Sequence, residues 1–188
     1  YVTGPIIMKS NINLHLAKGA LVIFSSDFSQ YPLVVSSFEG VDAARCQSPV
    51  VAENLENIAI TGQGIMNGNG YYWRPVKKEK FTESQWKNHQ RDYGGVLTAD
   101  KKMWYSSEKA LKGSLTNNIS KLTEGKTLSD FEDVKDFLRP NMIRIYQCKN
   151  ILIKDVTFEN SPAWTTHLMM SEHITIKNLK VKNPWYGT

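Results

Sequence analysis

Cysteine is scarce in this sequence. The 188 residues contain only Cys46 and Cys148. Two cysteines cannot form the disulfide framework of a small secreted domain, so both are expected to be buried free thiols. Together with four scattered histidines they give no metal-ligand spacing, and we expect neither a metal site nor any other cofactor.

Long apolar runs are also missing. No stretch of 18 apolar residues occurs, so we expect no transmembrane helix and no membrane partner. The chain opens without the features of a signal peptide, and its first residues, 1–5, look like the interior of a structure. We therefore expect the natural protein to extend beyond this N-terminus.

The excess of one charge sign is small. Lys and Arg number 23 against 18 Asp and Glu, a formal net charge of +5. This excess could favour an acidic polysaccharide or a nucleic acid, and it fits an ordinary solvated surface equally well. A nucleic-acid binder would show salt-sensitive binding to arbitrary duplex DNA. Nothing but the charge supports that reading, and we expect no nucleic-acid partner.

What the sequence does contain is a repeat of 23 residues between Pro140 and Pro184. At this offset residues 150–153 align with residues 173–176, and Val156 aligns with Leu179. Apolar and polar residues alternate within each copy, which indicates strands. A unit of this length cannot bury its apolar face alone, so the repeat predicts a stack of similar units, each one turn of a parallel β-helix.

The repeat reaches toward the N-terminus. Residues 57–60 carry the same Asn-Ile pattern, and residues 11–14 precede them by 46 positions, which is twice 23. The competing interpretation is a β-sandwich whose strands share Asn-Ile pairs by chance. We expect Asn160 and Asn183 to be structural, hydrogen-bonding along the stack at a turn.

Two segments interrupt the pattern. Residues 25–47 are rich in turn formers and are expected to form an irregular loop. Residues 71–139 are rich in Lys and Glu, with helices expected at 83–91 and 130–138. We interpret 71–139 as a partly helical insertion between turns, and not as a separate domain, within one partial β-helix domain covering 1–188. Such insertions often lie on the binding face; its tryptophans, Trp73, Trp86 and Trp104, either stack on sugars or pack the insertion.

Register predicts a surface. If Ile143 and Ile145 face the core, Arg144 and His167 face outward on neighbouring strands about 4.8 Å apart. Such a basic ladder is either a cradle for carboxylated sugars or a solvated pair without a ligand.

The acids of the repeat are candidates for catalysis by residue type only. Asp155, Glu159 and Glu172 lie at strand ends or turns, and register brings no two of them onto one face. We therefore assign no catalytic residue within the chain.

Several motifs together resemble glycoside hydrolase family 28, the polygalacturonases and rhamnogalacturonan hydrolases. The segments that carry the resemblance are 3–6, 9–11, 14–20, 57–64, 67–70, 72–73, 139–143, 148–151 and 158–167. The resemblance covers most of the chain except about 25–48 and the insertion.

The resemblance implies an all-β fold, the right-handed parallel β-helix of the pectin-lyase type. It also implies inverting hydrolysis of galacturonide linkages in pectic polysaccharide, by carboxyl groups about 6.5–9.5 Å apart. The family's Asn-Thr-Asp, Asp-Asp, Gly-His-Gly and Arg-Ile-Lys motifs are absent from this sequence, which stops where the first would follow. We expect the chain to be the N-terminal part of such an enzyme, inactive by itself.

The resemblance also suggests where substrate binds. The position matching His167 lies one turn before the family's first catalytic aspartate. His167 is therefore expected to contact substrate, with Arg144 and Trp164 beside it. The expected partner is an acidic pectic polysaccharide or oligosaccharide, and the implied location is secreted or periplasmic.

Two other functions stay open. One is a non-catalytic carbohydrate-binding or structural β-helix, of the adhesin or phage-tail type. The other is a β-helix lyase, which would need a calcium site of clustered acids that the repeat lacks. The oligomeric state is open, although an open β-helix exposes its end strands, so we expect the isolated 188 residues to associate through the Thr188 end.

Overall fold

The computed structural model describes residues 1–38, 40–116 and 121–184. Within these residues the chain forms two compact units. The first unit comprises Tyr1–Tyr31, Ser48–Gly70 and Asn141–Asn183. The second comprises Pro32–Gln47, Tyr71–Pro140 and Pro184.

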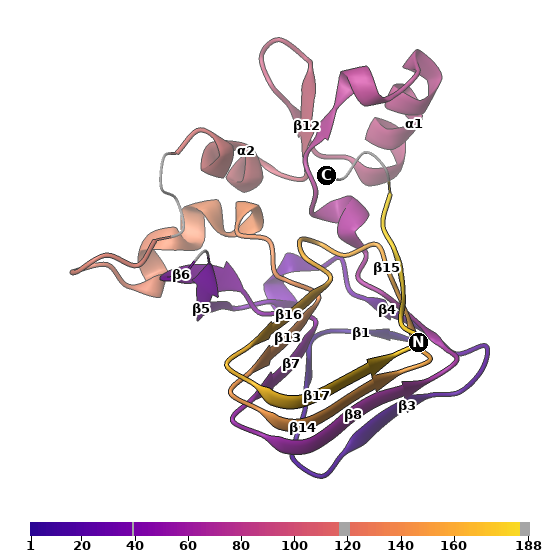
Figure 1. The fold of residues 1–188 in the computed structure, drawn as a ribbon. Helices are drawn as coiled ribbons and strands as arrows, with labels where there is room; N and C mark the ends of the chain where they lie inside the picture. The colour runs from indigo at the N-terminus through magenta and orange to yellow at the C-terminus, as the bar shows by residue number, and fades with distance from the viewer. Residues whose placement is uncertain (39, 117–120, 185–188) are drawn as a thin grey trace. The chain divides into compact units, whose positions relative to one another are not determined.

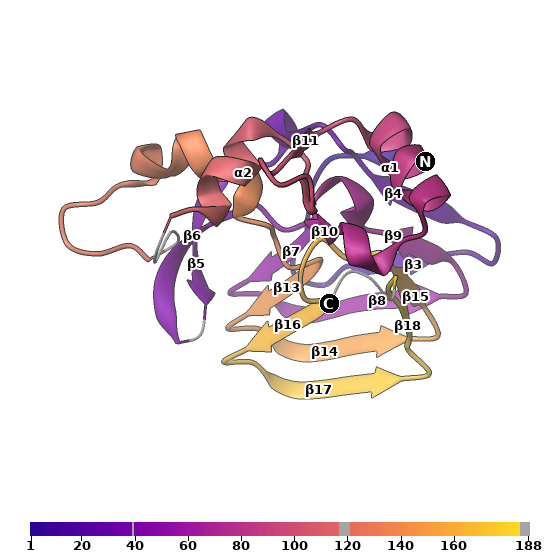
Figure 2. The same ribbon diagram turned by 90° about the horizontal axis from the view of Figure 1, so that it is seen from above.

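The first unit is a stack of turns, each of which gives one strand to each of three sheets (Figures 1 and 2). One sheet contains β1 (Val2–Thr3), β4 (Leu21–Phe24), β9 (Ile65–Asn67), β15 (Thr157–Glu159) and β18 (Lys180–Lys182). The second contains β2 (Ile6–Ile7), β7 (Val50–Glu53), β13 (Ile143–Tyr146) and β16 (Thr166–Met169). The third contains β3 (Asn13–Leu16), β8 (Glu56–Gly62), β14 (Lys149–Lys154) and β17 (Glu172–Lys177). All of these strand pairs are parallel, which makes this unit the parallel β-helix that the repeat predicts.

The register follows the predicted offsets. Ile151 of β14 pairs with Ile174 of β17, 23 positions later, and with Ile58 of β8 on the preceding turn. Asn13 of β3 pairs with Ala59 of β8, 46 positions later. The Asn-Ile repeats are therefore consecutive turns of one stack, and the β-sandwich alternative is wrong.

The core of this unit lies inside the stack. Alternate residues of each strand point inward because successive side chains of a strand face opposite sides of a sheet. The buried members include Met8, Leu16, Phe24, Val50, Ile58, Ile60, Met66, Ile143, Ile145, Ile151, Ile153 and Phe158. Burying one such side chain stabilises the fold by about 1.5–3 kcal/mol, so the continuous interior column holds the turns together.

A ladder of polar side chains marks one corner of the stack. Asn11, Asn57, Asn150 and His173 all have positive φ, between 55° and 64°. Asn57 Nδ2 donates to Asn11 Oδ1 at 2.9 Å, Asn150 Nδ2 donates to Asn57 Oδ1 at 2.9 Å, and His173 Nδ1 lies 3.2 Å from Asn150 Oδ1. Asparagine tolerates this left-handed backbone better than most residues, which explains its recurrence at the corner.

Asn160 and Asn183 also bond along the stack, although with other partners. Asn160 is buried and its Nδ2 donates to Asn67 Oδ1 at 3.3 Å. Asn183 Oδ1 accepts from the Ser161 backbone N–H at 2.9 Å. Both therefore have the structural role that the sequence predicts.

The second unit begins with a hairpin that the sequence did not reveal. Strands β5 (Leu33–Phe38) and β6 (Val41–Cys46) pair antiparallel, so the expected irregular loop over 25–47 is wrong for 33–38 and 41–46. The short 3-10 helix η1 (Phe28–Gln30), in the first unit, occupies part of the rest. The alternation typical of a strand is hidden in β5, because Val34 and Val35 are adjacent and so are Ser36 and Ser37.

The remainder of the second unit is mixed. Its antiparallel sheet contains β10 (Val76–Lys77), β12 (Met103–Tyr105) and β11 (Val96–Leu97), beside the short helices η2 (Gly70–Tyr72) and η3 (Lys78–Lys80). The predicted helix at 83–91 is confirmed as α1 (Glu83–Tyr93), which begins with a capping box between Thr82 and Gln85. The helix expected at 130–138 is the 3-10 helix η4 (Leu128–Phe137), and α2 (Glu108–Ser114) was missed.

The tryptophans of 71–139 pack the second unit internally. Trp73, Trp86 and Trp104 are 2%, 4% and 0% exposed. Trp86 and Trp104 form a cluster with Val76. These side chains therefore offer no face to a sugar. That 71–139 is an insertion and not a domain of its own stays a prediction.

None of the helices in the described part of the chain is both long and apolar enough to cross a membrane.

Candidate functional site

The outward face of the sheet containing β7, β13 and β16 holds the residues that the sequence singled out. Arg144 pairs in register with Val51 on one side and with His167 on the other. Ile143 and Ile145, which flank Arg144, are 0% and 1% exposed and point into the core. The predicted neighbourhood of Arg144 and His167 on adjacent strands is therefore present.

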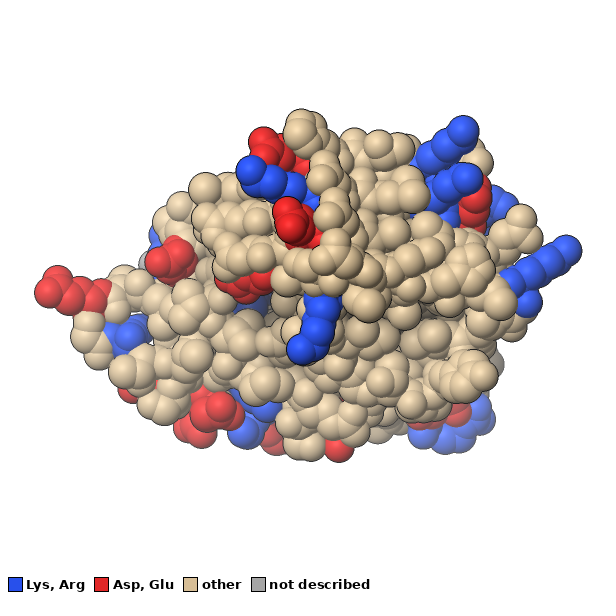
Figure 3. All heavy atoms as spheres, turned by 90° about the horizontal axis from the view of Figure 1, so that it is seen from below, with Lys and Arg blue, Asp and Glu red and all other residues tan. Residues whose placement is uncertain are grey.

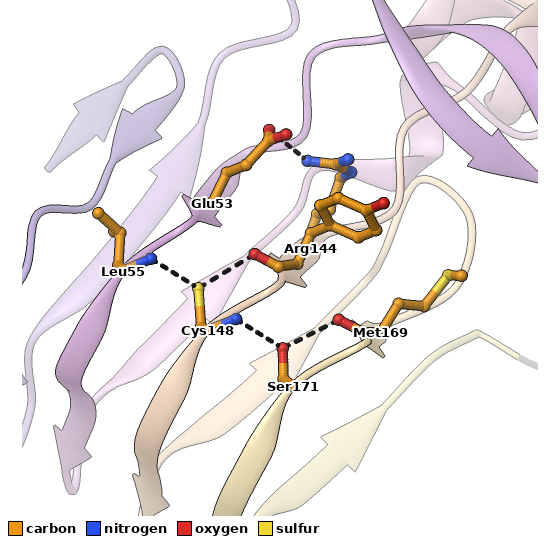
Figure 4. A network of polar contacts seen from close by, with 7 residues as sticks. Glu53, Leu55, Arg144, Cys148, Met169 and Ser171 are labelled. Atoms are coloured by element: carbon orange, nitrogen blue, oxygen red, sulfur yellow. Dashed lines mark hydrogen bonds and ion pairs between the residues drawn. The ribbon is translucent and has the colours of Figure 1, made fainter.

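Arg144 is not the solvated cation that an outward ladder suggested. It is only 9% exposed, and its Nη1 lies 2.9 Å from Glu53 Oε2 in an ion pair (Figure 4). Its Cζ lies 5.0 Å from the centre of the Tyr146 ring. A charge-assisted bond to a carboxylate fixes the guanidinium in one orientation. Arg144 is thus a held group, with part of its charge already balanced.

Glu53 is the site residue that sequence reasoning missed. It ends β7, two positions after Val51, and pairs in register with Tyr146 of β13. Its side chain remains 46% exposed despite the ion pair. The offset of 93 that relates Val51 to Arg144 also relates Glu53 to Tyr146, and this register was the available signal. This register could not be read from the sequence, because the long segment between β7 and β13 hides which residues of the two strands pair.

His167 and Trp164 form the second part of the site. Their ring centres lie 5.5 Å apart at an interplanar angle of 52°. Trp164 is 48% exposed, whereas its backbone oxygen accepts bonds from Ser161 Oγ at 3.0 Å and the Met142 N–H at 2.9 Å. A fixed backbone with an exposed indole is suited to packing against the apolar face of a sugar ring.

A corner beneath the site keeps its strands in register (Figure 4). Cys148 Sγ accepts from the Leu55 N–H at 3.4 Å and lies 3.3 Å from the Tyr146 backbone oxygen. One turn later, Ser171 Oγ accepts from the Cys148 N–H at 3.0 Å and donates to the Met169 oxygen at 2.9 Å. These bonds satisfy backbone groups at the ends of the three strands that carry Glu53, Arg144 and His167.

Both cysteines are buried free thiols, as predicted. Burial raises the pKa of the Cys46 thiol to about 12, so it stays protonated and unreactive. Cys148 serves the corner described above. Neither thiol lies where a substrate would meet it.

The other acids considered at the outset have local partners. Asp155 Oδ1 accepts from Asn178 Nδ2 at 2.8 Å. Glu159 lies 3.6 Å from Lys182 Nζ, and Glu172 lies 2.7 Å from Lys149 Nζ. They belong to different strands or corners of the stack. Across the described ranges, no three His, Cys, Asp or Glu residues gather in a way that could hold a metal ion.

The site can therefore do three things chemically. Arg144 and His167 provide cationic or hydrogen-bond-donating groups for an acidic or hydroxylated ligand. Trp164 provides a flat apolar surface. Glu53 orients Arg144 and contributes the one carboxylate of this group.

Comparison with known proteins points in one direction. The chain is 25% identical to a probable polygalacturonase of Vitis vinifera over 190 residues, which is 98% of this chain and 28% of the relative. No family model matches the chain.

Solved structures show the same relationship. The hyperthermoactive exopolygalacturonase from Thermotoga maritima is 28% identical with a TM-score of 0.59, over 97% of this chain and 37% of that protein. The family 28 exopolygalacturonase of Yersinia enterocolitica is 15% identical with a TM-score of 0.58, over 99% of this chain and 32% of that protein, which shows the shared fold alone. The chain thus spans well under half the length of each of these relatives.

These matches confirm the resemblance read from the sequence. The chain is similar, along nearly all of its length, to the polygalacturonases of glycoside hydrolase family 28, and its fold is their right-handed parallel β-helix.

Proposed function

We propose that the protein carrying this chain is a pectin-degrading glycoside hydrolase of the polygalacturonase type. The observation that carries the proposal is the 28% identity to an exopolygalacturonase over 97% of the chain, with the same fold. Its substrate would be an acidic pectic polysaccharide or oligosaccharide, and its location secreted or periplasmic.

Within this chain the proposed role is substrate binding. Arg144, held by Glu53, would attract the carboxylate of a galacturonate unit, because a desolvated and oriented guanidinium binds carboxylates well. His167 would hydrogen-bond to the sugar, and Trp164 would pack against its ring. Inverting hydrolysis is part of the proposal through the family resemblance, and its acid and base are not assigned to residues of this chain.

The test is a variant of His167 in the complete protein that carries this chain. His167→Ala should lower kcat/KM on polygalacturonate about five- to thirtyfold, since a hydrogen bond to a substrate is worth about 1–2 kcal/mol. Its circular dichroism and Tm should match the wild type. His15→Ala is a matched control, because His15 is an exposed outward histidine of another sheet, bonded to Thr61. Wild-type kinetics in His167→Ala would remove His167 from the site.

Carbohydrate binding without catalysis is the second candidate. It is favoured by one observation: the site as described has a single carboxylate, Glu53, which is engaged with Arg144. Inverting hydrolysis needs two carboxyl groups. Binding of polygalacturonate with no release of reducing ends from the complete protein would establish this alternative and overturn the hydrolase proposal.

A further inference from the structure

A second polar surface lies at another corner of the β-helix, where β14 and β17 end. Asp155 and Asn178 occupy this corner on consecutive turns with φ of 65° and 54°, bonded side chain to side chain at 2.8 Å. Gly62 takes the same position on the preceding turn with φ of 105°, and a Cβ there would lie 2.0 Å from the Leu16 oxygen. The corner is therefore tightly stacked and preformed.

A groove of about 680 Å³ runs along this corner. Lys18 and Lys180 both line it, and Gln63, Thr157 and Asn178 supply amide and hydroxyl groups between them. Its volume falls within the range of about 300–1,000 Å³ that is usual for small-ligand sites. No aromatic side chain is among the described residues that line it. The groove therefore favours a hydrophilic ligand that is bound by charge and hydrogen bonds.

Two lysines on the neighbouring sheet lead to the groove. Lys154 and Lys177 pair in register on the outward side of β14 and β17. Lys154 and Lys177 directly precede the corner residues Asp155 and Asn178. In Figure 3, which views this face from below, blue side chains project at the right-hand side, toward which β14 and β17 run in Figure 1.

The charge at this corner is largely unbalanced. Lys154 lies 3.8 Å from Asp155, the one carboxylate in the groove lining. Within the described ranges, Lys18, Lys177 and Lys180 form no ion pair within 4.0 Å. Asp155 Oδ1 also accepts a hydrogen bond from Asn178 Nδ2, so this carboxylate already has two partners. Lysines spaced one strand apart, about 4.8 Å, match an extended polymer with repeated negative charges.

We propose that this groove, with Lys154 and Lys177 beside it, binds a carboxylated polysaccharide as a second contact surface outside the Arg144–His167 site. The two surfaces belong to different sheets of the same β-helix. The inference rests on the proposed function for the class of polymer, a polyuronate. Duplex DNA is the poorer fit, because its charges recur about every 1.7 Å of axis, much closer than the strand spacing of about 4.8 Å, and single strands are usually bound by aromatic stacking.

The test compares two double variants of the complete protein by their binding to immobilised polygalacturonate at low ionic strength. Lys18→Gln with Lys180→Gln should weaken binding about fivefold, because each solvent-exposed ionic contact contributes modestly. Lys9→Gln with Lys87→Gln removes the same charge from exposed lysines elsewhere and should bind like the wild type. Wild-type binding should also weaken as salt rises through about 0.15 M, and neutral dextran should not bind.

Three outcomes overturn the inference. They are unchanged binding in the groove variant, equal losses in both double variants, and duplex DNA binding as tight as polygalacturonate. Hydrolysis is measured separately on a short galacturonate oligomer, for which the groove variant should keep the wild-type rate. An inactive wild type would refute the proposed function, while the polymer-binding comparison would still decide the groove.

Discussion

At the scale of single residues, the ion-pair partner of Arg144 determines the orientation of its side chain. Alternation in β13 places Arg144 outward, yet the side chain is nearly buried and bonded to Glu53. A buried guanidinium without its carboxylate would be left with a desolvated, uncompensated charge. The ion pair is therefore a structural requirement as well as a way to aim Arg144.

Glu53→Gln should destabilise the protein by about 1–2 kcal/mol, less than a fully buried pair would because the Glu53 side chain is half exposed. Urea unfolding measures the loss. Glu172→Gln is the matched control, because Glu172 pairs with Lys149 in solvent and its removal should cost less than about 1 kcal/mol. Equal effects of the two variants would contradict the structural role of the Arg144 pair.

His89 predicts a pH dependence of stability in the second unit. It is 5% exposed, and its ring lies 4.5 Å from Trp104 and 4.8 Å from Tyr93 between ring centres. Burial lowers the pKa of His89 below the ordinary 6.5, against a smaller opposing effect of Asp92. The unfolded chain therefore binds a proton more readily than the folded one.

Stability from His89 should be fully present above pH 6.5 and be lost as pH falls through that value toward the lowered pKa. Melting followed by near-ultraviolet circular dichroism measures Tm across this range. His89→Phe should flatten the dependence of Tm on pH. A Tm of the wild type that does not fall with acidification would contradict the prediction.

At the scale of elements, the ladder of polar side chains at the corner links consecutive turns of the β-helix. Asn57 both donates to Asn11 and accepts from Asn150, while its φ of 55° disfavours other side chains. The contribution of Asn57 to the free energy of unfolding therefore comes partly from its hydrogen bonds and partly from its backbone conformation.

Two substitutions separate these parts. Asn57→Ala should cost about 2–3 kcal/mol, because it loses both bonds and strains the backbone. Asn57→Gly loses the same hydrogen bonds, but glycine adopts a positive φ without strain. It should therefore cost about 1 kcal/mol less than Asn57→Ala. Chemical unfolding compares them; a glycine variant no more stable than the alanine variant would show that positive φ matters little there.

The local sequence pattern of each element explains whether that element could be predicted. Strands of the repeat were found because one pattern recurs on successive turns, and α1 was found because Thr82 and Gln85 give a helix start. The β5–β6 hairpin was missed because its alternation is interrupted by adjacent Val34 and Val35 and adjacent Ser36 and Ser37. Helix α2 was missed because it has only 7 residues. Their formation depends on packing within the second unit, which local pattern does not encode.

At the scale of the whole molecule, the last described turn differs from those before it. Ile174 and Ile176 are 40% and 48% exposed, whereas Ile151 and Ile153, their partners one turn earlier, are 2% and 0% exposed. Strands β16, β17 and β18 each form the edge of a sheet in the described chain. Thr188, named in the predicted association, lies outside the described residues.

A polypeptide of these 188 residues should self-associate through β17, since open edges and exposed isoleucines both favour strand pairing. Sedimentation velocity should show species larger than 21.4 kDa. The double variant Ile174→Lys with Ile176→Lys should shift the sedimenting species toward the monomer, and its circular dichroism spectrum should match that of the wild type. A monodisperse wild-type monomer would contradict the prediction.

The sequence by itself determined the stack. The 23-residue period, the alternation within each copy and the recurring asparagines fix the strands, their register and their inward faces, because each turn repeats the same local solution. That is also why Arg144 and His167 could be placed side by side in advance.

Only the tertiary structure decided what the outward residues do. Glu53 bonds to Arg144 at a sequence separation of 91, and Lys18 and Lys180 line one corner groove. Outward side chains are not constrained by the core, so their partners depend on how distant turns align and on which groups burial leaves exposed. Charge balance at a surface is thus set by the fold, while the inside of the fold is set by the repeat.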